Sequence, residues 1–146
     1  MQLYTHENAE RYNYGISRSW LDKGQIVVIK TEGDMSRNAI NTWASLLILT
    51  IQDWDKEKPL AALHDLSHPN QGLTPYARER TAELLKQLPN TRQNYSAVVL
   101  PQSFMFRIVE MFIRTPIFRH PCHEIRVFTN RETALAWLRE KLSNHL

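Results

Sequence analysis

The sequence predicts an α/β fold in which a mixed, mostly parallel sheet of five strands is covered by four helices. Short runs of β-branched and other apolar residues alternate with segments whose apolar residues recur at three- and four-residue steps. The first two apolar runs follow each other without a helix between them, which predicts an antiparallel hairpin. The expected element order is therefore ββαβαβαβα, with right-handed crossovers between the parallel strands.

The strands are predicted from alternating or continuous apolar residues bounded by turn residues. The expected strands are residues 12–20, 25–32, 60–66, 95–100 and 125–129. Asp22-Lys23-Gly24 is a tight turn between the first two strands. The run YSAVVL at 95–100 is continuously apolar, as expected for a strand inside a parallel sheet.

The helices are predicted from amphipathic spacing and from residues that cap helix ends. The expected helices are residues 37–54, 75–88, 103–114 and 130–142. Asp34 or Ser36 can cap the first helix, and Thr74, followed by a proline, can cap the second. Thr129 and Glu132 have the spacing of a capping box for the last helix. The four tryptophans fall mainly on the apolar sides of these elements, so we expect them in the core.

The composition limits the class of protein. A chain of 146 residues with 42% hydrophobic and 23% charged residues fits one soluble domain over 1–146, in which residues 1–10 form a loosely held end. No run approaches the ~18 to 20 apolar residues of a membrane helix. The net charge of +3 is spread along the chain, which argues against nucleic-acid binding. The polar amino terminus and the single cysteine indicate a cytoplasmic protein without an internal disulfide.

Several short motifs in this order resemble the STAS superfamily, the SpoIIAA-like domains of anti-sigma-factor antagonists. They are QIVVIKTEGDM with the following Asn38-Ala39-Ile40, the DLS of residues 65–67, AVVLP, and the closing VFTNRETALAWL. The resemblance covers roughly residues 24–142. It implies a SpoIIAA-like fold and a non-enzymatic domain that acts through protein partners. In some members, phosphorylation at the start of the helix after the central strand switches that action.

The loop after the strand 60–66 is the expected functional site, because ligands and partners of open α/β sheets meet the carboxyl ends of strands. We expect Asp65, His68 and Gln71 to form a partner or ligand loop here. The family's Ser-Ser-Gly turn is absent, and Ser67 and Thr74 are the loop's remaining candidate phospho-acceptors. The alternative for Thr74 is that it simply caps the helix.

Three functions are compatible with the sequence. The first is a regulatory or scaffolding domain that binds protein and forms a homodimer, with no catalytic residue, cofactor or metal. The second is a sensor with a pocket for a small apolar molecule or lipid beside the end of strand 60–66. A closed, dry space under helix 103–114 would favour this sensor. The third is an enzyme that uses His64, His68 or Cys122, although His64 and Asp65 should point to opposite faces of their strand.

Helix 103–114 is apolar over an arc of about 220°, wider than a helix on a sheet usually buries. We therefore expect a self-association surface on it. Its residues are Phe104, Met105, Phe106, Val109, Phe112 and Ile113. The alternative is cover from the first hairpin or from residues 119–124.

Overall fold

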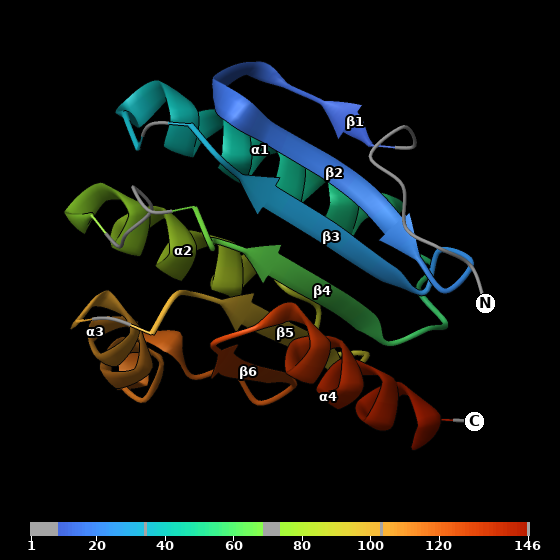
Figure 1. The fold of residues 1–146 in the computed structure, drawn as a ribbon. Coiled ribbons are helices and arrows are strands. Elements are labelled where there is room, and N and C mark those ends of the chain that lie inside the picture. The colour runs from blue at the N-terminus through green and yellow to red at the C-terminus, as the bar shows by residue number, and fades with distance from the viewer. Residues whose placement is uncertain (1–8, 34, 69–73, 103, 146) are drawn as a thin grey trace.

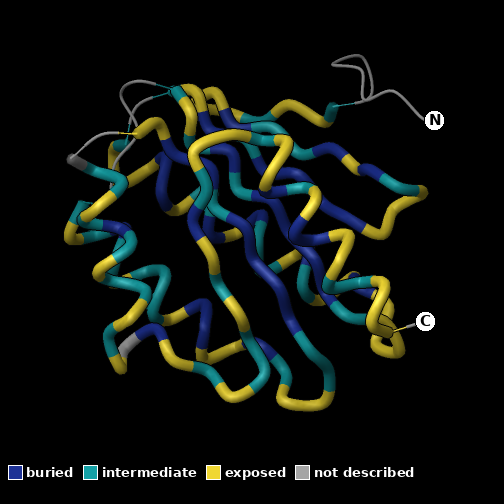
Figure 2. The backbone as a smooth tube through the Cα atoms, turned by 60° about the horizontal axis from the view of Figure 1, so that its bottom comes forward, coloured by how far each residue is buried: buried dark blue, intermediate teal, exposed yellow. Residues whose placement is uncertain are grey.

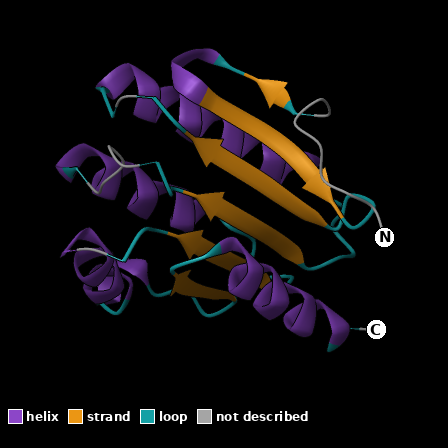
Figure 3. Cartoon of the chain, in the orientation of Figure 1, coloured by secondary structure: helices purple, strands orange, loops and turns teal. Residues whose placement is uncertain are grey.

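The computed structural model describes residues 9–33, 35–68, 74–102 and 104–145. They form one sheet with the strand order β1-β2-β3-β4-β5-β6 and helices on both faces, which confirms the predicted α/β class (Figures 1 and 3). The strands are β1 (Glu10–Arg11), β2 (Ile16–Leu21), β3 (Ile26–Thr31), β4 (Leu60–Asp65), β5 (Asn94–Val99) and β6 (His123–Phe128). The helices are α1 (Arg37–Asp53), α2 (Pro75–Gln87), α3 (Phe104–Ile113) and α4 (Arg131–Ser143), with short 3-10 turns η2 (Asn13–Gly15) and η3 (Pro116–Phe118).

The strand directions follow the predicted order. β1, β2 and β3 pair antiparallel, whereas β3, β4, β5 and β6 pair parallel. Asp22 and Lys23 in the hairpin turn have φ of 53° and 59°, and Gly24 has 85°. These left-handed conformations match the twist of the two strands, so the turn fixes the β2–β3 register.

The sheet has six strands rather than the expected five. The additional strand, β1, is two residues long and pairs with β2. Glu10 accepts hydrogen bonds from Arg18 at 2.9 Å and from the Trp20 indole at 3.4 Å, so side-chain pairing supports a strand without hydrophobic periodicity. Glu10 therefore lies in a strand, whereas residues 1–8 lie outside the described part, so the loosely held end stays a prediction.

Two boundary predictions also differ from the structure. β2 begins at Ile16 rather than at Tyr12, because Tyr14 and Gly15 have φ of 65° and 70° and interrupt the extended chain. The cap of α4 is Asn130 and not Thr129: the Asn130 side chain accepts from the Thr133 amide at 2.9 Å.

The face of the sheet under α4 is tightly packed. Ala61, Ala97 and Ala134 are completely buried there, and these small side chains bring α4 close to β4 and β5. Trp137 and Leu138 complete one continuous cluster with the strands. Figure 2 shows buried residues concentrated along the central strands.

The opposite face carries α1, α2 and α3. Its buried apolar residues form three separate clusters, one under α1, one between α2 and η3, and one under α3. α1 and α2 contact each other more extensively than they contact the strands. Trp54 is buried here as expected, whereas Trp20 is 39% exposed at the edge of the sheet. In the described ranges, no helix has the length and hydrophobicity needed to cross a membrane.

Candidate functional site

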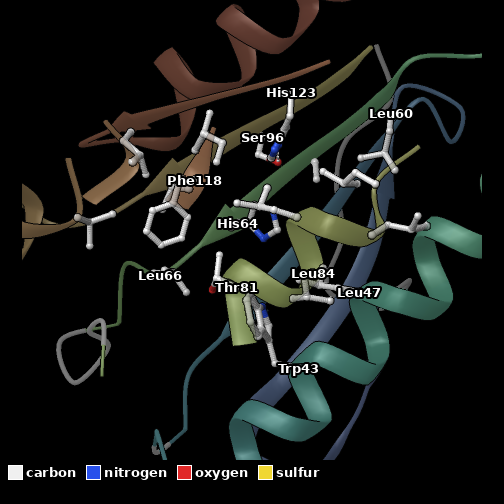
Figure 4. A pocket seen from close by; sticks show the side chains of 18 of the residues that line it. Trp43, Leu47, Leu60, His64, Leu66, Thr81, Leu84, Ser96, Phe118 and His123 are labelled. Carbon is white, nitrogen blue, oxygen red and sulfur yellow. Dashed lines mark hydrogen bonds between the residues drawn. The ribbon is translucent and has the colours of Figure 1, made fainter. Parts of the chain in front are cut away.

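A cavity of about 160 Å³ lies between the sheet and the three helices of this face (Figure 4). Its floor is formed by β3, β4, β5 and β6, and its walls by α1, α2, α3 and η3. Trp43 and Leu47 line it from α1, Thr81 and Leu84 from α2, and Phe118 from η3. It therefore lies where the three hydrophobic clusters of the face meet without merging.

Small side chains on the strands explain the open space. Ala62 and Ser96 are paired neighbours on β4 and β5, and both point towards the helices. Under α4, small strand residues are met by the equally small Ala134, whereas here α2 presents Leu84 and Leu85 and stays away from the strands. The resulting gap is not filled by side chains.

Three polar side chains stand together on the cavity floor. The Ser96 hydroxyl and His123 Nε2 are 2.7 Å apart and share a hydrogen bond. Ser96 pairs with Ala62 and Ile125 across the strands, so His64 and His123 lie diagonally on either side of Ser96. Figure 4 shows the His64 ring projecting from β4 among the apolar side chains of the lining.

Both histidines are neutral at physiological pH. Burial lowers the pKa of His64 from 6.5 to about 4. Burial also lowers the pKa of His123 to about 3, and repulsion from His64 and His120 adds to this effect. Nδ1 of His64 and Nδ1 of His123 are buried and have no hydrogen-bond partner among the described residues. Unsatisfied buried polar atoms are rare in folded proteins, so these two nitrogens are exceptions to the usual pairing of buried polar groups.

Cys122 and His120 lie in a turn, and their contacts are not those of a catalytic pair. His120 Nε2 lies 3.1 Å from the Leu88 carbonyl, and its Nδ1 accepts from the Cys122 amide at 3.1 Å. The Cys122 thiol donates to the Asn90 carbonyl at 3.4 Å. Because both nitrogens of His120 are engaged with the backbone, that ring is not oriented to act as a base for Cys122.

The residues predicted for the loop after β4 are placed in part. Asp65 is buried and lies on the α4 side of the sheet, opposite to His64, as the alternation predicts. It accepts hydrogen bonds from the Ser67 amide at 3.0 Å and from the Ser67 hydroxyl. Ser67 is exposed and His68 is half-buried, whereas Gln71 lies outside the described residues.

Thr74 caps α2, because its hydroxyl oxygen accepts from the Ala77 amide at 3.1 Å. This contact gives Thr74 a structural role and leaves its phosphorylation a prediction. The described residues contain no group of three or more His, Cys, Asp or Glu that could hold a metal ion.

The predicted self-association residues of α3 pack largely against their own chain. Val109 is buried with Leu100 and Val127, and the half-buried Met105, Phe106 and Ile113 pack on the same cluster. Phe112 packs on the cluster of Leu85, Leu88 and Phe118. The side chain of Phe104 lies outside the described part. Among the described side chains of α3, the apolar residue most open to solvent is Met111, at 70% exposure.

Comparisons with known proteins support the fold. No family model matches the sequence, and no curated protein matches it. A solved structure, the crystal structure of an anti-sigma factor antagonist from Mycobacterium paratuberculosis, is similar with a TM-score of 0.57 at 12% identity. The match covers 88% of this chain and 97% of that chain. The chain therefore has the SpoIIAA-like fold that its motifs resemble.

The cavity was only partly predictable. From the sequence, a pocket beside the end of β4 was one alternative, and a closed, dry space under helix 103–114 was the observation that would favour a sensor. Val109, Phe112 and Ile113 of α3 do form one wall. The available signal was Ser96, a small polar residue within the apolar run of β5, next to a strand carrying His64. The position of His123 on the cavity floor could not be predicted, because it depends on the register of β6 against β5.

Proposed function

We propose that the chain is a non-catalytic, cytoplasmic regulatory domain that acts by binding a protein partner at the loop after β4. The observation that carries this proposal is the fold, which this chain shares with an anti-sigma factor antagonist. The position of the loop at the carboxyl end of a central parallel strand supports it further, because open α/β sheets present their binding residues there.

Ser67 is the better placed of the two candidate phospho-acceptors. It is exposed, whereas the Thr74 oxygen is engaged in the helix cap. A phosphate on Ser67 would lose the hydrogen bond to Asp65 and would stand beside that carboxylate, so charge repulsion would open the loop. A phosphate on Thr74 would instead meet free N–H groups at the start of α2. Modification at Ser67 would thus change the docking loop without charging the interior.

Site-specific crosslinking tests the docking surface. A photoreactive phenylalanine derivative replaces Ser67 in one variant and the exposed Lys56, in the loop that precedes β4, in the other. We expect illumination in extracts of the host to join one defined protein to the position-67 variant and not to the position-56 variant. The same protein captured equally from both positions, or from neither, would contradict docking at this loop.

A small-molecule sensor is the second candidate function, and the cavity favours it. A pocket of about 160 Å³ lined almost entirely by apolar side chains is uncommon in a core of ordinary packing density. Native mass spectrometry of the protein purified from its own host tests this function directly. We expect a mass excess over the polypeptide that disappears on denaturation. A polypeptide mass without excess, in protein kept below its unfolding temperature throughout, would count against the sensor.

Homodimer formation through α3 also remains part of the proposal. The packing of α3 on Leu100, Val127 and Phe118 leaves Met111 as the apolar side chain most available for a second copy. The contact would therefore be smaller than the sequence alone suggested. A charged residue at this position is the appropriate probe of the dimer.

A further inference from the structure

The polar groups of the cavity with unused hydrogen-bonding capacity lie together on its floor. Two threonines also line the cavity, but their hydroxyl protons are engaged: Thr50 donates to the Leu46 carbonyl at 2.7 Å, and Thr81 donates to the Ala77 carbonyl at 2.7 Å. Ser96 and His123 bond to each other. The His64 imidazole stands beside this pair, and its Nδ1 has no hydrogen-bond partner among the described residues.

The lining excludes charged ligands. None of the described residues that line the cavity is an aspartate, glutamate, lysine or arginine, and the two histidines are neutral. A bound carboxylate or ammonium group would therefore lose its hydration without gaining a counter-charge. A neutral hydroxyl or carbonyl group has no such penalty and can bond to a neutral imidazole, which offers one donor and one acceptor.

The volume limits the size of the ligand. An engineered apolar cavity of about 150 Å³ binds benzene, so a cavity of about 160 Å³ suits a molecule of similar size. A long-chain lipid would need substantially more space. The apolar walls from α1, α2 and α3 would enclose the body of the ligand, and the floor would contact one polar substituent.

We propose that this cavity binds a neutral small molecule with a compact apolar body of about benzene size and a single hydroxyl or carbonyl group that hydrogen-bonds to His64 beside the Ser96–His123 pair. The proposal rests on the second candidate function, the small-molecule sensor, and specifies its ligand class. The competing occupant is ordered water on the same polar groups, because water needs only polar partners and enough space.

Calorimetric titration at pH 7.5 with phenol, toluene and benzoate tests the proposal, because these probes differ mainly in their polar group. We expect phenol to bind roughly tenfold more tightly than toluene, the upper range for one net hydrogen bond, and benzoate to show no binding. In a His64→Leu variant, phenol should lose this advantage and toluene should retain its affinity. A His145→Leu variant removes an exposed histidine that bonds to Tyr95 outside the cavity, and it should behave as the native protein.

Imidazole nitrogen NMR of the native protein locates the contact independently of any variant. Phenol should shift the His64 resonances and leave those of His145 unchanged. Equal affinity for phenol and toluene would overturn the polar contact while the sensor function survives. If no probe binds, or only benzoate binds, the ligand class is overturned. If the protein purified from its host carries a bound mass while none of the three probes binds, the proposed ligand class is wrong but the sensor function survives.

Discussion

Lowering the pH from 7.5 to 5 tests the burial of His64 and His123 in the folded chain. Their folded pKa values of about 4 and about 3 lie below the ordinary value of 6.5, which the unfolded chain should show. The unfolded chain therefore takes up these protons first as the pH falls. The free energy of unfolding therefore has its full value above about pH 6.5, and it decreases progressively as the pH falls towards the folded pKa values.

The expected loss is large compared with the stability of a small domain. Each histidine contributes up to ~1.4 kcal/mol per pH unit within this window. At pH 5 each contributes a loss of about 2 kcal/mol relative to pH 7.5, so that together they remove roughly 4 kcal/mol. The free energy of unfolding of a typical domain is about 5–15 kcal/mol.

Urea unfolding at constant ionic strength between pH 8 and 4.5 measures this dependence. The His64→Leu variant should lose about half of the slope below pH 6.5, because one of the two histidines is removed. The His145→Leu variant, which alters an exposed side chain, should keep the native slope. A native slope in the His64→Leu variant would refute the conclusion that partial burial keeps this imidazole neutral in the folded state.

Three further predictions concern stability and association. In Gly33→Ala, the new Cβ would clash with the Tyr14 carbonyl oxygen, so we expect chemical unfolding to show a stability loss of roughly 1–3 kcal/mol, and native stability would disprove the close approach. Met111→Glu should convert a dimer to a folded monomer in sedimentation at tens of micromolar, whereas a native monomer would end the self-association proposal. Thr74→Ala should lower the free energy of unfolding by ~1 kcal/mol, because the helix cap is lost. After incubation of this variant with host kinases, mass spectrometry should still detect phosphate on Ser67. Phosphate found only at other residues would contradict the proposed switch.

Most of the fold follows from local patterns in the sequence. The apolar periodicity predicted α1 to within one residue of its observed Arg37–Asp53 range, and the Thr74-Pro75 pair located the start of α2. These features depend on neighbouring residues, which is why a sequence reveals them. Asn130 and Thr129 are both good caps, and the choice between them depends on the path of the chain as it leaves β6.

Features that depend on contacts between distant segments were less predictable. The strand β1 is held by Glu10 and Arg18, a charge pair that no periodicity reports. The cavity floor brings together His64, Ser96 and His123 from three strands, and their adjacency requires the register of all three. α2 contacts α1 and η3, which come from distant parts of the chain, so its distance from Ala62 and Ser96 could not be predicted from local sequence.

The unequal packing of the two faces of the sheet has a mechanical consequence. The alanine contacts beneath α4 leave little volume to compress, whereas the cavity of about 160 Å³ on the other face is volume that side chains do not fill. Hydrostatic pressure acts on such voids. Compression of the protein should therefore act first on α1 and α2, while α4 and the strands beneath it remain in place as the rigid half of the molecule.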